Sequence, residues 1–332
     1  MAKGIAILLV VYLHCCSPST QTPLDVSLKA LRMPLYFTLS GVFFSTYGSF
    51  FNLIKKKTNK MIIPFVFFLI ISYIIQWIID YHGTGSVTLS FTDNFTLSRR
   101  WWNNPNWPNI ALWFLVSLFW ANCIFYFTTN STKSLVRQCL CVFLIGFTGV
   151  LLGFWGKRLP LYIDSAFTAL PYFFLGYLLR TTKLLYGAVS KKEIVILIIC
   201  LFALFIVSNM SWSFIDFKRN MIMGNPLVAL TLPIFAVTGI LLLCKLIKRL
   251  PGISFIGRYS IVVLGFHYPV ICILKSFWPI GEYSNIIVFL MTLALMPLAI
   301  QLCINKIPYF VAQKDLISIN KLPVSESKSI QH

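Results

Sequence analysis

Long apolar stretches are the feature that most constrains this chain. They recur along its length, for example at 62–79, Leu135–Phe154 and 194–207. A helix of about 20 apolar residues is needed to cross the hydrocarbon core of a bilayer. Only 11% of the residues are charged and 58% are hydrophobic, whereas soluble domains carry roughly a quarter charged residues. The sequence therefore predicts an all-α, polytopic membrane helix bundle.

The apolar segments predict about ten transmembrane helices within one membrane domain at 1–308. The expected spans are 2–16, 33–51, 61–80, 110–128, 135–154, 165–180, 191–208, 226–246, 258–275 and 285–304. An even number of spans places both termini on the same side. The polar segment 309–332 is predicted to be a disordered tail.

The orientation follows from the positive-inside rule, by which Lys and Arg gather in cytoplasmic loops. With both termini in the cytoplasm, 19 of the 28 basic residues fall in inner loops. The nine outer ones are Lys29, Arg32, Arg99, Arg100, Lys157, Arg158, Lys218, Arg219 and Lys275. The charge of +19 is thus explained by topology rather than by nucleic-acid binding. We expect the protein in the cell membrane, without a cleavable signal peptide.

The nine cysteines lie mostly within apolar segments, where cysteine behaves as a small hydrophobic residue. Their spacing indicates neither a disulfide framework nor a metal site, and we expect no metal. The outer loop at 81–109 holds Trp101, Trp102 and Trp107 among Asn and Pro. These tryptophans are predicted either to form an interfacial belt, which is the more general role of Trp, or to face a carbohydrate.

Ionisable residues within a membrane span are costly and are therefore candidates for function. His14 lies in the far part of the first span, eleven residues after Lys3. Eleven helical residues make nearly three full turns and rise about 16 Å, so the two side chains share a face. This spacing suits coenzyme A, whose phosphates would stay at the surface while the thioester reaches inward. Equally, His14 could be a packed histidine and Lys3 a topological anchor.

The second predicted span begins LRMPLYFTLSG. Pro34 is expected in the first turn of the helix, where its missing N–H has no consequence. Ser40 and Gly41 permit close helix packing. Arg32 would lie at the outer surface, as a site residue or as an anchor at the interface.

A basic pair precedes the third span in KKKTNKMIIP. Lys57 and Lys60 are three residues apart and would share a helix face. Such a pair could bind phosphates, or it could be part of the positive-inside signal alone.

His267 lies deep in the ninth span, in IGRYSIVVLGFH. It would line the same cavity as His14 or bond a backbone carbonyl. Two carboxylates at helical spacing are not found in the sequence, nor is a Ser-His-Asp arrangement.

In their order and spacing, these motifs resemble those of the integral-membrane acyltransferase family 3, from residue 1 to about 305. KGIAILLVVYLH is similar to the first-helix signature, a basic residue, ten others and a histidine. RMPLYFTLSG and KTNKMIIP resemble the next two motifs, ALWFLVSLFW resembles a Trp-Phe-Leu motif at Trp113, and YFFLGYLLR and IGRYSIVVLGFHYPV resemble later helices. Arg32 departs from the family, in which many relatives carry histidine.

The resemblance implies transfer of an acyl group, usually acetyl, from cytoplasmic acyl-CoA to a sugar hydroxyl outside. It implies that His14 acts as a general base or as an acyl relay, and that Lys3, Lys57 and Lys60 hold the coenzyme phosphates. Arg32, Ser40, Trp113 and His267 would then line the acceptor site. A flippase or other transporter of polysaccharides or lipid-linked sugars is the alternative, against which the shared face of Lys3 and His14 argues.

Overall fold

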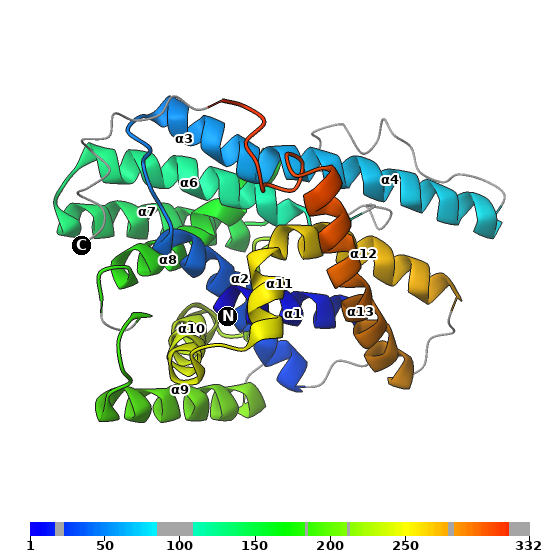
Figure 1. The fold of residues 1–332 in the computed structure, drawn as a ribbon. Coiled ribbons are helices and arrows are strands. Elements are labelled where there is room, and N and C mark those ends of the chain that lie inside the picture. Colours follow the sequence, from blue (N-terminus) through cyan, green and yellow to red (C-terminus); the bar gives the residue numbers. More distant parts are fainter. Residues whose placement is uncertain (17–22, 85–108, 183–184, 211–212, 278–281, 319–332) are drawn as a thin grey trace.

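The computed structural model describes residues 1–16, 23–84, 109–182, 185–210, 213–277 and 282–318. Helices make up most of this part, as the all-α prediction requires (Figure 1). The exception is an antiparallel hairpin of β1 (Phe214–Asp216) and β2 (Met221–Met223), which the sequence did not predict. The tryptophans Trp101, Trp102 and Trp107 lie outside the described residues.

The helices follow one another in the order of the predicted spans. They are α1 (Ala2–Cys15), α2 (Pro23–Val42), α3 (Phe50–Lys57), the π-helical turn η2 (Thr58–Ile62), α4 (Ile63–Thr84), α6 (Trp113–Ser131), α7 (Leu135–Phe154), the 3-10 turn η4 (Pro160–Tyr162), α8 (Ile163–Leu179), α9 (Lys191–Met210), α10 (Pro226–Ile247), α11 (Pro251–Arg258), α12 (Ser260–Phe277) and α13 (Glu282–Lys306).

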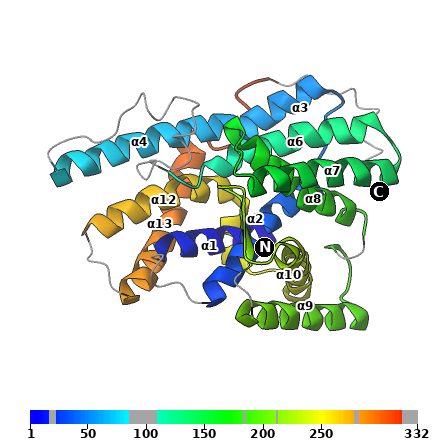
Figure 2. The ribbon, with the colours of Figure 1, turned by 180° about the vertical axis from the view of Figure 1, so that it is seen from behind.

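Helix α1 lies in the middle of the molecule in both views (Figures 1 and 2). It packs against α2, α11, α12 and α13, and Ala6, Ile7 and Val11 on it are fully buried. Helices α3 and α4 run along one edge of the bundle and α9 lies at the opposite edge. The short first helix is therefore enclosed by the others.

Helices α2 and α8 cross at two glycines. A Cβ on Gly41 would lie 1.8 Å from the carbonyl oxygen of Phe173, and one on Gly176 would lie 1.8 Å from that of Thr38. Since no side chain tolerates such distances, glycine at both positions is what lets the two backbones touch. This confirms the expectation of close packing at Gly41.

The predicted second span at 33–51 is wrong in its boundaries. Helix α2 begins at Pro23 and ends at Val42, and Pro34 lies inside it rather than in its first turn. The chain then turns through Tyr47 and Gly48, both with positive φ. Ser49 starts α3 by accepting a hydrogen bond from the Asn52 amide, the usual role of an N-cap serine.

Within the described residues, four helices are long and apolar enough to cross a membrane. They are Phe50–Tyr81, Leu135–Phe154, Pro226–Ile247 and Asn285–Lys306. A fifth span is possible if α11 and α12, which meet at an angle of 88°, form one broken span. Helix α1 is apolar but has only 14 residues. The count of ten spans is therefore not confirmed and stays a prediction.

Residues 309–318, which we expected to be the start of a disordered tail, pack against the π-helical turn. The Asn59 side chain accepts hydrogen bonds from the amides of Leu316 and Ile317 and donates one to the Ile317 carbonyl. Lys56 lies 2.8 Å from Asp315 and Lys60 lies 3.7 Å from it. Burial raises the pKa of the Asp315 carboxyl, but the two lysines outweigh it and hold that pKa below its ordinary value. The side chain of buried Asn59 therefore holds this segment in place through hydrogen bonds to its backbone.

Candidate active site

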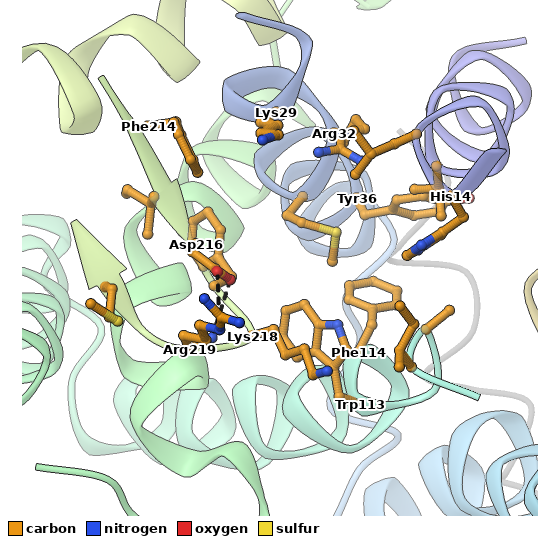
Figure 3. Close-up of a pocket in the computed structure, with 18 of the residues that line it drawn as sticks. His14, Lys29, Arg32, Tyr36, Trp113, Phe114, Phe214, Asp216, Lys218 and Arg219 are labelled. Carbon is orange, nitrogen blue, oxygen red and sulfur yellow. Dashed lines mark hydrogen bonds and ion pairs between the residues drawn. The ribbon is translucent and has the colours of Figure 1, made fainter. Parts of the chain in front are cut away.

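A cavity of about 410 Å³ opens beside the end of α1 that carries His14 (Figure 3). Its walls come from α1, α2, the first turn of α6 with the residues before it, α12 and the β-hairpin. His14 is half-buried and points into the cavity. Two other residues predicted for the site, Arg32 and Trp113, also line it.

The hairpin that closes one side of the cavity is held by hydrogen bonds to α7 and α8. Its turn passes through Asn220, whose φ of 45° is a left-handed conformation that asparagine tolerates. The Asn220 side chain donates to the Gly149 carbonyl and accepts from the Thr168 hydroxyl. Ser165 donates to the Phe217 carbonyl 2.6 Å away. The residues between β1 and β2 therefore have a defined position.

Positive charge dominates the cavity wall. Four cationic side chains line it, namely Lys29 and Arg32 from α2 and Lys218 and Arg219 from the hairpin. The carboxylate in the same wall is that of Asp216, 3.9 Å from the Arg219 guanidinium. Burial lowers the pKa of the Lys218 ammonium, and the Asp216 charge opposes that shift. His14 lies within electrostatic range of Arg32, Lys218 and Lys275.

Aromatic rings form the rest of the wall. Trp113 and Phe114 of α6, Tyr36 of α2 and Phe214 of the hairpin line the cavity, and the rings of Phe114 and Tyr36 are in contact, with centres 5.1 Å apart. Trp113 is only 7% exposed, and its ring lies 5.6 Å from that of Tyr162. Aromatic rings of this kind present large apolar surfaces to a ligand.

The two candidate histidines pack against each other, but His267 does not line the cavity that His14 lines. Their ring centres are 5.3 Å apart. His267 is fully buried, and its Nδ1 lies 2.9 Å from the Val263 carbonyl oxygen, so of the two alternatives predicted for it the bond to a backbone carbonyl is the one observed. Because a carbonyl can only accept, Nδ1 carries the proton and Nε2 is an acceptor. That Nε2 has no hydrogen-bond partner among the described residues.

The basic residues predicted to bind coenzyme phosphates lie away from this cavity. Lys3 is at the opposite end of α1, with its Nζ 4.7 Å from the centre of the Phe43 ring. Lys57 is 8% exposed and lies close enough to Lys3 for the two charges to repel each other. Lys60 instead donates to the Ala312 carbonyl and pairs with Asp315. The structure therefore brings Lys3 and Lys57 together but not Lys57 and Lys60.

A second cavity, of about 290 Å³, lies beside the start of α1 and is lined in part by Met1, Lys245 and Lys248. Neither cavity is lined by Lys3, Lys57 or Lys60. Ser40, which was expected to line the acceptor site, donates to the Tyr36 carbonyl of its own helix instead and lines neither cavity.

The sequence did not single out the hairpin residues of the cavity. Lys218 and Arg219 were counted only as outer-loop cations, and Asp216 was not considered. The one feature of the sequence that could have pointed to them is a pair of adjacent cations in a predicted outer loop, where the positive-inside rule disfavours Lys and Arg. Which helices the loop lies against could not be read from that signal.

A family model described as an acyltransferase domain matches residues 1–304 of this chain. No curated protein and no solved structure matches it. The match spans every element that lines the cavity around His14.

Proposed function

The chain belongs to the acyltransferase 3 family, and from this premise we propose that it is a membrane O-acyltransferase. The enzyme moves an acyl group, acetyl in the first instance, from cytoplasmic acyl-CoA to a hydroxyl of an extracytoplasmic glycan. The observation that carries the proposal is the position of His14, which faces a lined cavity next to His267.

A hydroxyl is a poor nucleophile until a positioned base removes its proton, and a neutral imidazole suits this task at physiological pH. In the first route, a His14 nitrogen takes the hydroxyl proton while the oxygen attacks the thioester carbonyl carbon. The carbon–sulfur bond breaks and its electron pair leaves with sulfur. The imidazolium then returns the proton to the thiolate, which gives free coenzyme A and the ester.

In the second route, the unprotonated His14 nitrogen attacks the thioester carbonyl carbon, the carbon–sulfur bond breaks, and the departing thiolate takes the proton that the acylated imidazole loses. The glycan hydroxyl then attacks the acyl-imidazole, the carbon–nitrogen bond breaks, and the imidazole takes up the hydroxyl proton as the ester forms. In either route His267 is a positioning residue. Its Nε2 is available as an acceptor for a His14 N–H, which would leave the other His14 nitrogen unprotonated and ready to react.

The donor would approach from the Lys3 end of α1. Lys3 and Lys57 are like charges held close together, and a phosphate between them would relieve their repulsion. Lys3 lies about 16 Å along the helix from His14, a distance that the long arm of coenzyme A covers. Lys60 would contribute less, since it is already paired with the segment after α13.

Replacing His14 tests the proposal. In proteoliposomes supplied with labelled acetyl-CoA and the envelope glycan, we expect His14→Ala to lower acetyl transfer by about 10²–10⁴-fold in the base route, and to abolish it in the relay route. His267→Gln should be milder, because it removes only an orienting contact. Label retained on the protein without acceptor would indicate the relay.

The control is His14→Asn with its melting temperature in detergent, which separates lost chemistry from lost folding. Near wild-type transfer by a well-folded His14→Ala protein would exclude the mechanism. Wild-type protein that moves glycan across the bilayer yet neither transfers acetyl nor hydrolyses acetyl-CoA would identify a transporter instead.

A further inference from the structure

The cavity at His14 gathers cations that are far apart in the sequence. Lys29 and Arg32 come from one turn of α2, and Lys218 and Arg219 come from a hairpin nearly 190 residues later. In the predicted orientation all four belong to the nine outer basic residues, so topology does not explain them. Their convergence on one cavity is a tertiary feature.

Cationic side chains outnumber carboxylates among the described residues that line this cavity. Four cations and one carboxylate line the cavity, and that carboxylate lies beside Arg219. Arg32 is 8% exposed and Lys218 is half-buried, so both charges are partly removed from water. These side chains can donate charge-assisted hydrogen bonds to an anionic group in the cavity, and such bonds are among the stronger ones in proteins.

Size and lining narrow the ligand further. A volume of about 410 Å³ lies within the range of small-molecule sites and accommodates one or two sugar rings. Trp113, Tyr36 and Phe214 line the cavity with aromatic surface, which suits the apolar side of a sugar. Arg32 and Lys218 line the same cavity as His14, so a glycan whose anionic group is bound by them would have its hydroxyls in the cavity that the imidazole faces.

We infer that the acceptor is an anionic glycan whose negative group, a phosphate or a sugar carboxylate, binds between Arg32 of α2 and Lys218 and Arg219 of the hairpin. That the bound glycan is the acceptor rests on the proposed function, whereas its binding at this site can be measured without turnover. A phosphate could come from a lipid-linked saccharide or from a phosphorylated sugar unit, and a carboxylate from a uronic acid.

The test compares three matched disaccharides on the full-length protein in nanodiscs of zwitterionic lipid. One disaccharide is neutral, one has a uronic acid in place of one sugar, and one carries a phosphate ester. Affinity is measured by calorimetry, and acetyl transfer from labelled acetyl-CoA is measured in parallel. We expect one or both anionic forms to bind at least about tenfold more tightly than the neutral form.

The variants are Lys218→Gln, Lys218→Gln with Arg219→Gln, and Lys157→Gln. The hydrogen bond from the Arg219 amide to Asp216 involves backbone, so both Gln variants keep it. The first two should bring the anionic ligands toward the affinity of the neutral one while leaving the neutral ligand unchanged. Lys157, an exposed outer cation that does not line the cavity, should behave as wild type.

Equal affinity of wild-type protein for neutral and anionic disaccharides would overturn the inference. An equal loss of affinity for all three ligands in the single Lys218→Gln variant would also overturn it, because it would indicate a structural role for Lys218. So would an equal loss of affinity in Lys157→Gln, because it would indicate that the overall positive charge of the protein attracts the ligand. Failure of all three disaccharides to bind in the zwitterionic nanodiscs would overturn it too. Selective binding without any acetyl transfer would support the inference and remove the proposed function.

Discussion

Lys57 and Lys60 stand three residues apart but have different partners. Lys57 is buried next to Lys3 and lies 5.8 Å from the centre of the Tyr47 ring, whereas Lys60 and Lys56 bind Asp315. The π-helical turn at Thr58–Ile62 begins between them. Its wider turn shifts the phase of the helix, so residues three apart no longer share a face.

This difference predicts separate effects for the two lysines. Lys57→Ala should raise the apparent KM for acetyl-CoA by about tenfold or more, because it removes a charged contact to phosphate. Lys60→Ala should leave that KM nearly unchanged and loosen residues 309–318, as seen by faster proteolysis after α13. Lys55→Ala is the control, since Lys55 lies over the Phe51 ring. An unchanged KM in a folded Lys57→Ala protein would show that Lys57 serves topology alone.

At the scale of the helices, the α2–α8 contact determines where the cations of α2 lie. Both helices approach through Gly41 and Gly176. The same helix α2 carries Lys29 and Arg32 about three turns before Gly41, and α8 anchors the hairpin through Ser165 and Thr168. One helix pair therefore holds both halves of the cationic wall in register.

Adding a methyl group at this contact should be destabilising. Gly41→Ala places its Cβ against the Phe173 carbonyl, and overpacking of this kind typically costs about 1–3 kcal/mol. We expect a lower melting temperature in detergent and a weaker anionic-glycan affinity than in wild type. Gly252→Ala on α11 is the matched control, because its Cβ would meet nothing within 4 Å. Equal melting temperatures of the two variants would mean that the helices separate easily.

At the scale of the whole molecule, the enclosed helix α1 joins two differently built ends. One end has Lys3 near Lys57, and the other has His14 at the cavity. Helix α1 spans about 21 Å, less than the roughly 30 Å of a bilayer core. A reaction at His14 would therefore take place within the depth of the membrane, with donor and acceptor arriving from opposite sides.

This arrangement requires the orientation expected from the distribution of basic residues. An epitope inserted at Gly156, in the open turn after α7, should be labelled on intact cells. A tag after Lys321 should be labelled only once the membrane is permeabilised. Labelling of the Lys321 tag on intact cells would reverse the donor side and contradict the proposed direction of transfer.

The sequence by itself determined what depends on local order along the chain. Apolar runs indicated helices wherever they were long, because a helix satisfies its own backbone hydrogen bonds in a membrane. The spacing of Lys3 and His14 put them on one face of α1, because helical geometry is regular. The helix boundaries near Pro34 were wrong because a proline can lie at the start of a helix or inside it, and tertiary packing decides which.

Only the tertiary structure decided which distant residues meet. His14 and His267 come together because α1 and α12 pack side by side. Lys218 joins Arg32 because Asn220, Ser165 and Thr168 hold a hairpin that looked like an ordinary loop in the sequence. Lys60 turns to Asp315 because a π-helical turn changes its direction. Such contacts depend on how elements far apart in the sequence pack together, and the local propensity of each element does not determine that packing.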